Sequence, residues 1–278
     1  MDEIKNGNIE ICPLISIITV CLNNEKELEE TFKSVVNQTY GNIEYIIIDG
    51  GSTDNTRDII KKYENKIDYW SSEPDRGIYD AMNKGVNVAR GKWINFMNAG
   101  DKFYSRNTIE QIFSKSFEGI DFVYGDCVIT YGSEFSRFQK AGDIKDLWKG
   151  MVFSHQSMFT KRDVFKTYHF SVKNRIGADF EFLYRCFMNK YRFYNTNIPI
   201  AKVSSGGVSD TNRIESILAR KSVIDQFSKS PKINLYYCML LVEAKIKSAI
   251  KKILPDKINL LLLKKKYKNK QRDEDCFL

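Results

Sequence analysis

The feature that most constrains the fold is the alternation of strand-like and helix-like segments over the first hundred residues. Runs rich in β-branched and aromatic residues, typical of buried strands, lie at 14–20, 43–48, 67–70 and 93–97. Between these runs, apolar residues recur at helical spacing in 25–37, in the segment after Asp54, and in 78–89. Four such alternations predict a doubly wound, mostly parallel α/β sheet with right-handed crossovers.

The second half of the chain has a different rhythm. Two strands, separated by Gly125 and Asp126, are predicted at 120–124 and 127–131, and a third at 158–160. Helices are expected at 178–189 and 211–227, with an extended segment at 192–200 between them. The pattern of 135–150 is ambiguous, and 206–209 reads as a turn or an acceptor loop.

Polar loops follow three of the predicted parallel strands. They are Asp49–Asp54, Glu73–Asn83 and the acidic turn Asn98–Asp101. Open α/β sheets bind their ligands at the carboxyl ends of the strands. Although each loop alone is compatible with an ordinary turn, the three together predict a binding site at this edge of the sheet.

Several motifs in order resemble a known family. They are Ser16–Val20 with Asn23, Ile48–Asp54, Glu73–Gly85, and Ala89–Trp93 leading into the acidic turn. Together they resemble the nucleotide-sugar-dependent glycosyltransferases of family 2, which have the GT-A fold. His155-Gln156-Ser157 and Gly177–Glu181 resemble a bacterial surface-polysaccharide branch of that family. The resemblance implies a GT-A domain over residues 1–230, with a nucleotide-binding half at about 12–105 and an acceptor half at about 106–230.

The resemblance also implies which residues bind the donor. Asp49 would accept a hydrogen bond from the N3–H of a pyrimidine, and Thr19 and Asn23 would line the same crevice. A motif that closes over the nucleoside and phosphates contributes Asp75, Arg76 and Asn83. The alternatives are that Asp49 belongs only to a tight turn and that Arg76 is a solvated loop residue.

The expected metal site departs from the family pattern. Family members usually carry several carboxylates that hold Mg²⁺ or Mn²⁺ against the diphosphate, whereas this turn reads Asn98-Ala99-Gly100-Asp101. One carboxylate can suffice when phosphates and water supply the other ligands. We therefore expect a weak Mg²⁺ or Mn²⁺ site at Asp101, with Asn98 contributing its amide oxygen. A helix-capping role for Asp101 is the alternative.

The catalytic base is expected in the second half. Asp179 begins a predicted helix at a position that resembles the acidic base of inverting family members. Glu181 is the second candidate, although on a helix it points to another face. His155 is a candidate contact for the diphosphate or the acceptor. The alternatives are a helix N-cap for Asp179 and a structural histidine at His155.

The positive charge of the chain is confined to its end. Residues 245–272 hold eleven of the 43 lysine and arginine residues and one of the 35 acidic residues. The remaining chain, with 32 basic and 34 acidic residues, is nearly neutral, which argues against a nucleic-acid binder. Within residues 231–278 we expect a helical, lysine-rich tail on which Ile246, Ala249, Ile250, Ile253 and Leu254 share one face. Such a tail favours either an anchor on anionic lipid or a helix packed on the domain.

These observations predict an inverting glycosyltransferase with a UDP-sugar donor and a lipid-linked saccharide acceptor, acting in bacterial polysaccharide biosynthesis. Met1–Glu10 is polar and shows no secretion signal, so we expect a cytoplasmic protein bound peripherally to the inner face of the membrane. The alternative is a nucleotide-binding or membrane-scaffold protein of the same fold whose catalytic site has decayed.

Overall fold

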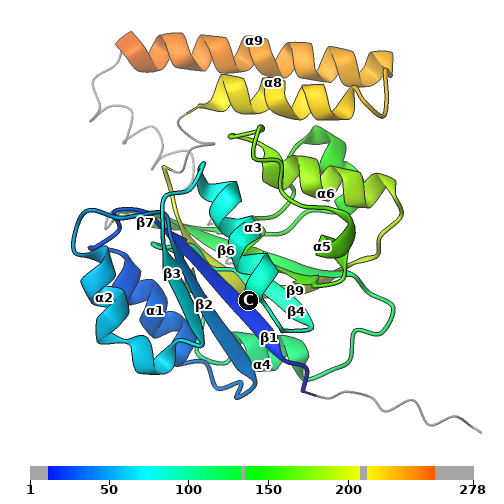
Figure 1. Ribbon diagram of the computed structural model, residues 1–278. Helices are drawn as coiled ribbons and strands as arrows, with labels where there is room; N and C mark the ends of the chain where they lie inside the picture. The colour runs from blue at the N-terminus through cyan, green and yellow to red at the C-terminus, as the bar shows by residue number, and fades with distance from the viewer. Residues whose placement is uncertain (1–11, 133–134, 207–211, 254–278) are drawn as a thin grey trace, which may run out of the picture.

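The computed structural model describes residues 12–132, 135–206 and 212–253 of the 278-residue chain. One mixed sheet runs through the molecule, with helices on both of its faces and a pair of helices stacked at one end (Figure 1). Residues 207–209 of the expected acceptor loop and the apolar segment 258–263 of the tail lie outside the described residues.

The first half forms the predicted parallel sheet. Its strands run in the order β3-β2-β1-β4, and each neighbouring pair is parallel. Because the four strands point the same way, their carboxyl ends share one edge of the sheet. The elements of this half are β1 (Ile15–Cys21), α1 (Leu28–Val36), β2 (Ile43–Asp49), α2 (Thr56–Lys62), η1 (Glu64–Lys66), β3 (Tyr69–Ser72), α3 (Ile78–Val88) and β4 (Trp93–Phe96).

Two hydrophobic cores lie on opposite faces of this sheet, because side chains alternate along a strand. Ile17 and Ile47 pack with α1, α2 and α4 (Thr108–Phe113), whereas Ile18 and Ile46 pack with α3, α5 (Val164–Thr167) and α6 (Ala178–Met188). Helix α3 lies close to β1 because residue 85 is glycine: a Cβ at Gly85 would collide with the side chain of Ile18.

The second half extends the sheet with antiparallel and parallel pairs. Strand β8 runs antiparallel to both β4 and β6, β9 runs parallel to β6, and β5 and β7 pair antiparallel with β9 and β6. The elements are β5 (Lys102–Phe103), α4 (Thr108–Phe113), β6 (Phe122–Tyr131), β7 (Phe135–Gln139), η2 (Ile144–Lys149), η3 (His155–Ser157), β8 (Met158–Lys161), α5 (Val164–Thr167), α6 (Ala178–Met188) and β9 (Phe193–Ser204).

The two strands predicted on either side of Gly125 and Asp126 are in fact one strand, β6. Gly125 and Asp126 read as a turn, but here they produce a bulge, and the register against β9 shifts at Asp126. Residue 125 is glycine because the backbone of β9 comes close: a Cβ there would collide with the carbonyl oxygen of Ile198.

The last described elements form a helical hairpin of α8 (Arg213–Ile224) and α9 (Pro231–Ile253). Figure 1 shows α9 as the outermost helix, with α8 between it and the rest of the molecule. Helix α9 begins at the first residue of the predicted helical tail. Tyr237 and Ala244 bury it against the domain, and Tyr237 donates a hydrogen bond of 3.1 Å to the carbonyl of Trp148.

Candidate active site

The predicted donor loops do converge at the carboxyl edge of β1, β2 and β3. Asp49, the last residue of β2, is fully buried, and its carboxylate accepts hydrogen bonds from the Ser52 amide (3.0 Å) and the Ser72 hydroxyl (2.6 Å). The carboxylate of Asp75 lies against Gly50, where a Cβ would collide with it. Asn23, at a φ of 53°, accepts a hydrogen bond of 2.9 Å from the Thr53 amide. Asn23, Asp49 and Asp75 therefore belong to one polar cluster.

Arg76 is exposed and already paired. Its guanidinium lies 2.7 Å from Asp80, which accepts a further hydrogen bond from the Arg76 amide. The hydrogen bond from Arg76 keeps the pKa of Asp80 below its ordinary value. Because 74% of the Arg76 side chain is exposed, this ion pair is open to solvent and can rearrange.

Thr19 and Asn83 are oriented differently from the sequence-based expectation. The Thr19 side chain is fully buried, and its hydroxyl donates a hydrogen bond of 2.8 Å to the Met97 carbonyl. The Asn83 amide group is bonded at both ends to one residue: it donates to the Phe170 carbonyl (2.8 Å) and accepts from the Phe170 amide (3.0 Å). In this structure both side chains hold protein segments in place and leave no polar atom directed at the donor loops.

The acidic turn joins the two halves of the chain. One oxygen of Asp101 accepts a hydrogen bond from the Gln156 side chain (2.6 Å) and the other from the Ser204 amide (3.0 Å). Only 6% of Asp101 is exposed, and burial raises the pKa of its carboxyl. The Asn98 amide nitrogen lies 3.2 Å from Nε2 of His155, and its buried Oδ1 has no hydrogen-bond partner.

A divalent cation would find few ligands here. In the described part of the chain, no group of three or more His, Cys, Asp or Glu side chains is placed to hold a metal. The turn supplies the Asp101 carboxylate, each oxygen of which retains a lone pair, and the unpartnered Oδ1 of Asn98. Two oxygen ligands fit a Mg²⁺ or Mn²⁺ ion that obtains its remaining ligands from phosphate and water.

Asp179 lies in the first turn of α6, and His155 separates it from the acidic turn. Its Oδ1 accepts a hydrogen bond of 3.0 Å from the hydroxyl of Tyr79 on α3. Its Oδ2 lies 3.7 Å from Nδ1 of His155, whose other ring nitrogen faces Asn98. The side chain of Asp179 is 16% exposed, so the carboxylate is held by neighbours and still reachable. The chain Tyr79–Asp179–His155–Asn98 connects α3, α6, η3 and the acidic turn.

Glu181 takes no part in this chain of contacts. Its carboxylate pairs with Arg185 at 2.9 Å and accepts a hydrogen bond of 3.0 Å from Asn174. The sequence indicates no site role for Tyr79 or Gln156, although both lie inside the family motifs. Their partners are 100 and 55 residues away, so no local pattern indicates the contacts.

Fold and site together are those of a glycosyltransferase of the GT-A type: a parallel sheet, polar loops at its carboxyl edge, and a second half that carries a carboxylate toward those loops. The chain belongs to glycosyl transferase family 2, because residues 16–178 match the model of that family. Helix α6 begins at the last residue of this match.

Named relatives agree with this assignment. A Mycobacterium tuberculosis protein described as a PGL/p-HBAD biosynthesis glycosyltransferase is 36% identical over 183 residues, which are 64% of this chain and 71% of the relative. An uncharacterized glycosyltransferase of Methanocaldococcus jannaschii is 28% identical over 65% of this chain and 67% of its own length.

Solved structures share the fold. S. aureus TarS 1–349 in complex with UDP has a TM-score of 0.59 at 16% identity, covering 83% of this chain and 70% of that one. The mannosyltransferase PcManGT from Pyrobaculum calidifontis, in complex with GDP-Man and Mn²⁺, has a TM-score of 0.64 at 16% identity, covering 90% of this chain and 78% of that one.

Proposed function

We propose that this glycosyltransferase moves a sugar, with inversion, from a nucleotide-sugar donor to a lipid-linked saccharide acceptor in bacterial polysaccharide biosynthesis. The observation that carries the proposal is the position of Asp179. Tyr79, which comes from the predicted loop Glu73–Asn83, and His155 hold this carboxylate beside the acidic turn. A carboxylate held in this place can take the proton of an acceptor hydroxyl in a single in-line displacement.

In this reaction an acceptor hydroxyl oxygen forms a bond to the anomeric carbon as the bond from that carbon to the diphosphate oxygen breaks. Asp179 takes the hydroxyl proton, and the bonding electrons leave with the nucleoside diphosphate. His155 and Tyr79 position the carboxylate through the contacts described above. The proton transfer accounts for a factor of about 10²–10⁴ in rate.

The donor side of the proposal keeps Asn23, Asp49, Asp75 and Arg76. We assign Asp49 to the nucleoside base, where it would accept a hydrogen bond from the pyrimidine of a UDP-sugar. Asp49 is the last residue of β2 and lies inside the polar cluster. The hydroxyls of Ser52 and Ser72, which donate to its carboxylate, can rotate away from it. Arg76 is assigned to the phosphates, which would compete with Asp80 for its guanidinium. The side chains of Thr19 and Asn83 are left out as direct ligands because their polar atoms are bonded within the protein.

A bound Mg²⁺ or Mn²⁺ would offset the charge that develops on the leaving diphosphate. Asp101 and Asn98 are the residues of this chain that would hold it, with the donor phosphates and water as further ligands. Such a site is weak without the donor, because the chain itself supplies a single carboxylate at the turn.

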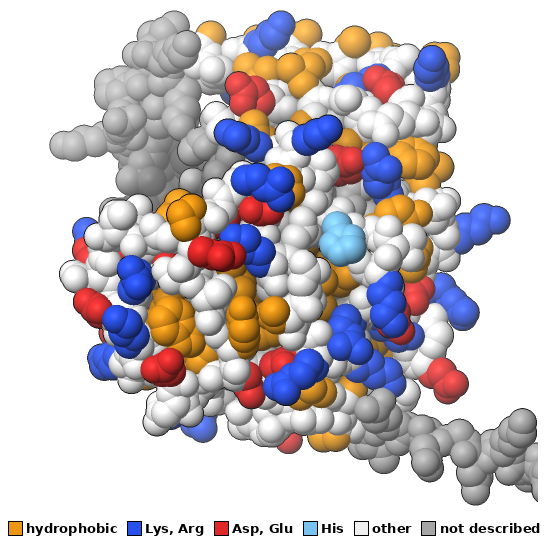
Figure 2. Space-filling model, viewed as in Figure 1, with side chains coloured by type: hydrophobic (Ala, Val, Ile, Leu, Met, Phe, Trp, Pro, Cys, Tyr) orange, Lys and Arg blue, Asp and Glu red, His pale blue; other side chains and the backbone are white. Residues whose placement is uncertain are grey.

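Helix α9 supports the membrane part of the proposal. Leu235, Met239, Val242, Ile246 and Ile250 are between 48% and 65% exposed. Their spacing places them on one stripe of the helix, and lysines follow closely in the sequence. Figure 2 shows hydrophobic side chains interspersed with lysine or arginine along the top of the molecule, over α9. An exposed apolar stripe next to lysines suits the surface of an anionic bilayer.

No helix in the described ranges is long and apolar enough to cross a bilayer. We therefore propose that residues 231–278 form a tail that lies on the inner face of the membrane, with residues 1–230 as the catalytic domain. This arrangement would bring the site to an acceptor held in the same membrane.

A screen against a panel of nucleotide sugars tests the proposed reaction. Purified full-length protein is mixed with each donor and a lipid-linked saccharide, and nucleotide release and product mass are measured. We expect one donor, a UDP-sugar, to give product of inverted anomeric configuration. Tight nucleotide binding without transfer from any donor would instead favour the decayed, nucleotide-binding alternative.

A further inference from the structure

Arg220 is a half-buried cation that the proposed reaction does not use. It lies on α8, where its Nε donates a hydrogen bond of 3.2 Å to the Ser216 carbonyl. Among the described residues, neither of its Nη groups has a hydrogen-bond or ion-pair partner. Buried guanidinium groups are normally paired, because removing them from water costs free energy. Burial accordingly lowers the pKa of Arg220, while the negative charge of Asp179 acts in the opposite direction.

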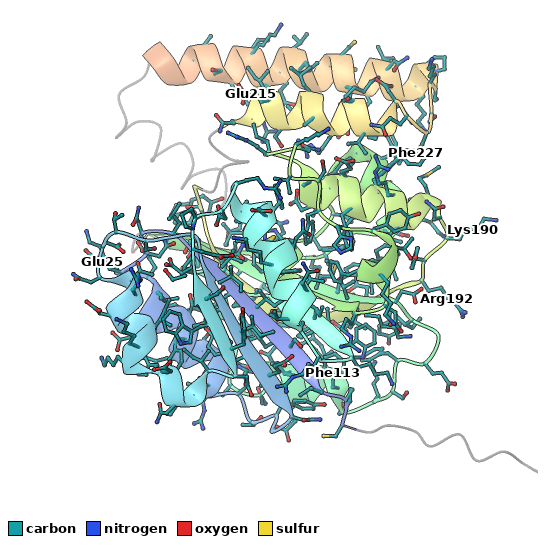
Figure 3. The ribbon with its side chains drawn as sticks, in the orientation of Figure 1. Glu25, Phe113, Lys190, Arg192, Glu215 and Phe227 are labelled. Carbon is teal, nitrogen blue, oxygen red and sulfur yellow. The ribbon has the colours of Figure 1, made fainter. Side chains whose placement is uncertain are left out.

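The surrounding backbone brings α8, which carries this guanidinium, against the start of the helix that carries the proposed base. Helix α8 packs against the start of α6, where a Cβ on Gly177 would lie 3.5 Å from the Cβ of Ala219. Asp179 is two residues beyond that contact. Nη1 of Arg220 lies 2.6 Å from where a Cβ on Gly150 would be, so the absence of a side chain at residue 150 leaves room for the guanidinium. Figure 3 shows α8 running from Glu215 toward Phe227, above α6.

The residues assigned to the site carry an excess of negative charge, which such a cation would offset. The residues assigned above include four carboxylates, Asp49, Asp75, Asp101 and Asp179, and one cation, Arg76, which is exposed and paired with Asp80. A phosphate-bearing substrate brings further negative charge to this site. One weakly held divalent ion offsets only part of it, so a fixed cation near Asp179 favours binding.

We propose that Arg220 binds a phosphate group of the substrates next to Asp179, with Arg213 as a second cation on the same helix. The two arginines are seven residues apart, so they lie near the same face of α8, and each acts electrostatically on the other. The planar fork of a guanidinium matches two phosphate oxygens. This inference rests on the proposed function for its ligand. Two sources are compatible with it: the diphosphate of the donor, and the phosphate that joins the acceptor saccharide to its lipid.

Binding measurements on Arg220→Gln and Arg220→Lys test the proposal. Calorimetry of the full chain with UDP, with uridine and with inorganic pyrophosphate separates phosphate contacts from nucleoside contacts. Arg185→Gln is the matched control, because Arg185 is a helical arginine of α6 whose partner is Glu181. Thermal unfolding of each variant establishes that it is folded, and the lysine variant keeps the charge if the glutamine variant does not fold.

If Arg220 binds the donor, Arg220→Gln weakens UDP and pyrophosphate binding about tenfold or more and leaves uridine binding unchanged, whereas Arg185→Gln changes neither. If it binds the acceptor instead, UDP binding stays constant and KM rises for a phosphate-linked acceptor but not for the free saccharide. Folded variants with wild-type values in both assays would overturn the inference. If the wild-type protein binds pyrophosphate through Arg220 but binds no nucleotide, the inference about Arg220 stands and the proposed function is overturned.

Discussion

The hydroxyl of Tyr79 lies 3.0 Å from Oδ1 of Asp179, so a residue of the first half of the chain holds the proposed base of the second half. Burial raises the pKa of Tyr79, which therefore remains protonated and donates to the carboxylate. Tyr79 also packs against Phe170, the residue that Asn83 holds in place. The two halves of the site are thus aligned through a few contacts of α3.

Tyr79→Phe is expected to lower kcat with little change in KM for the donor. A hydrogen bond to a charged group contributes about 1.5–3 kcal/mol, so the loss of orientation corresponds to roughly a ten- to hundredfold slower reaction. Steady-state kinetics would measure both constants. Tyr184→Phe, which removes a hydroxyl from α6 itself, is the control and should behave as wild type. An unchanged kcat for Tyr79→Phe would show that the hydroxyl does not position the base.

Asp179→Asn should remove transfer almost completely and leave nucleotide binding intact, because the amide keeps the shape of the carboxylate but cannot take the proton. The expected loss in rate is about 10²–10⁴-fold. Glu181→Gln should retain most of the activity, since its carboxylate is occupied by Arg185 and Asn174. The reverse pattern, with activity lost at residue 181, would transfer the role of base to Glu181.

Asp101→Ala should weaken UDP binding measured in the presence of Mn²⁺, and EDTA should weaken UDP binding to the wild type to a similar extent. In the variant, addition of EDTA should change little further, because both treatments remove the same ion. Calorimetry with and without Mn²⁺ gives the comparison. If EDTA-treated wild type transfers sugar at the full rate, Asp101 does not hold an essential metal ion. Its role is then structural, through its hydrogen bonds with Gln156 and Ser204.

Glu44→Gln should destabilise the fold at neutral pH. Only 3% of Glu44 is exposed; burial opposes its ionisation, but hydrogen bonds from Ser16 and Arg90 outweigh burial and keep its pKa below the ordinary value. A depressed pKa contributes stability above the unfolded-state pKa, and this contribution disappears as the pH falls through the folded-state value. Chemical denaturation should therefore show a loss of about 2 kcal/mol at pH 7 that shrinks on acidification. The exposed Glu118→Gln serves as the control, and a pH-independent difference would contradict this account.

Deleting residues 245–278 should abolish sedimentation with anionic liposomes and slow transfer to a lipid-linked acceptor, with UDP binding unchanged. The cut follows Ala244, the last buried side chain of α9 among the described residues, so the packed part of the helix remains. Met239→Gln with Ile246→Gln should weaken sedimentation without any deletion, whereas Met188→Gln, at an exposed site on α6, should not. High salt should release the full-length protein. Equal sedimentation of truncated and intact protein would rule out the anchor.

The sequence alone was sufficient for the parts of the fold that depend on local pattern. Strands β1, β2 and β4 and helix α3 each carry their own periodicity and their own turn residues, and the structure confirms them nearly to the residue. Strand β6 was predicted as two strands because Gly125 and Asp126 are turn formers. Pairing with β9 overrides that local preference, and this pairing cannot be read from the sequence near residue 125.

The same limit applies to the site. Asp49 and Asp179 could be proposed from the sequence because each stands at a motif position that is also the end of a strand or the start of a helix. Asn83 was assigned to the donor by its motif, but Phe170 engages both of its polar atoms. The roles proposed for Tyr79 and Arg220 rest on contacts between distant segments, so the sequence does not indicate them. Half-burial of an arginine on a helix with mixed polarity leaves little trace in the sequence.

The paired hydrogen bonds between Asn83 and Phe170 also make the protein sensitive to chemical change at Asn83 during storage. Deamidation would turn Asn83 into aspartate and replace the nitrogen that donates to the Phe170 carbonyl with a second acceptor oxygen, so that two oxygens would repel each other at that point. The segment that carries Phe170 against Tyr79 would lose one of its two hydrogen bonds to Asn83. Storage history, followed by mass spectrometry of the peptide containing residue 83, therefore belongs among the variables controlled when batches of this enzyme are compared.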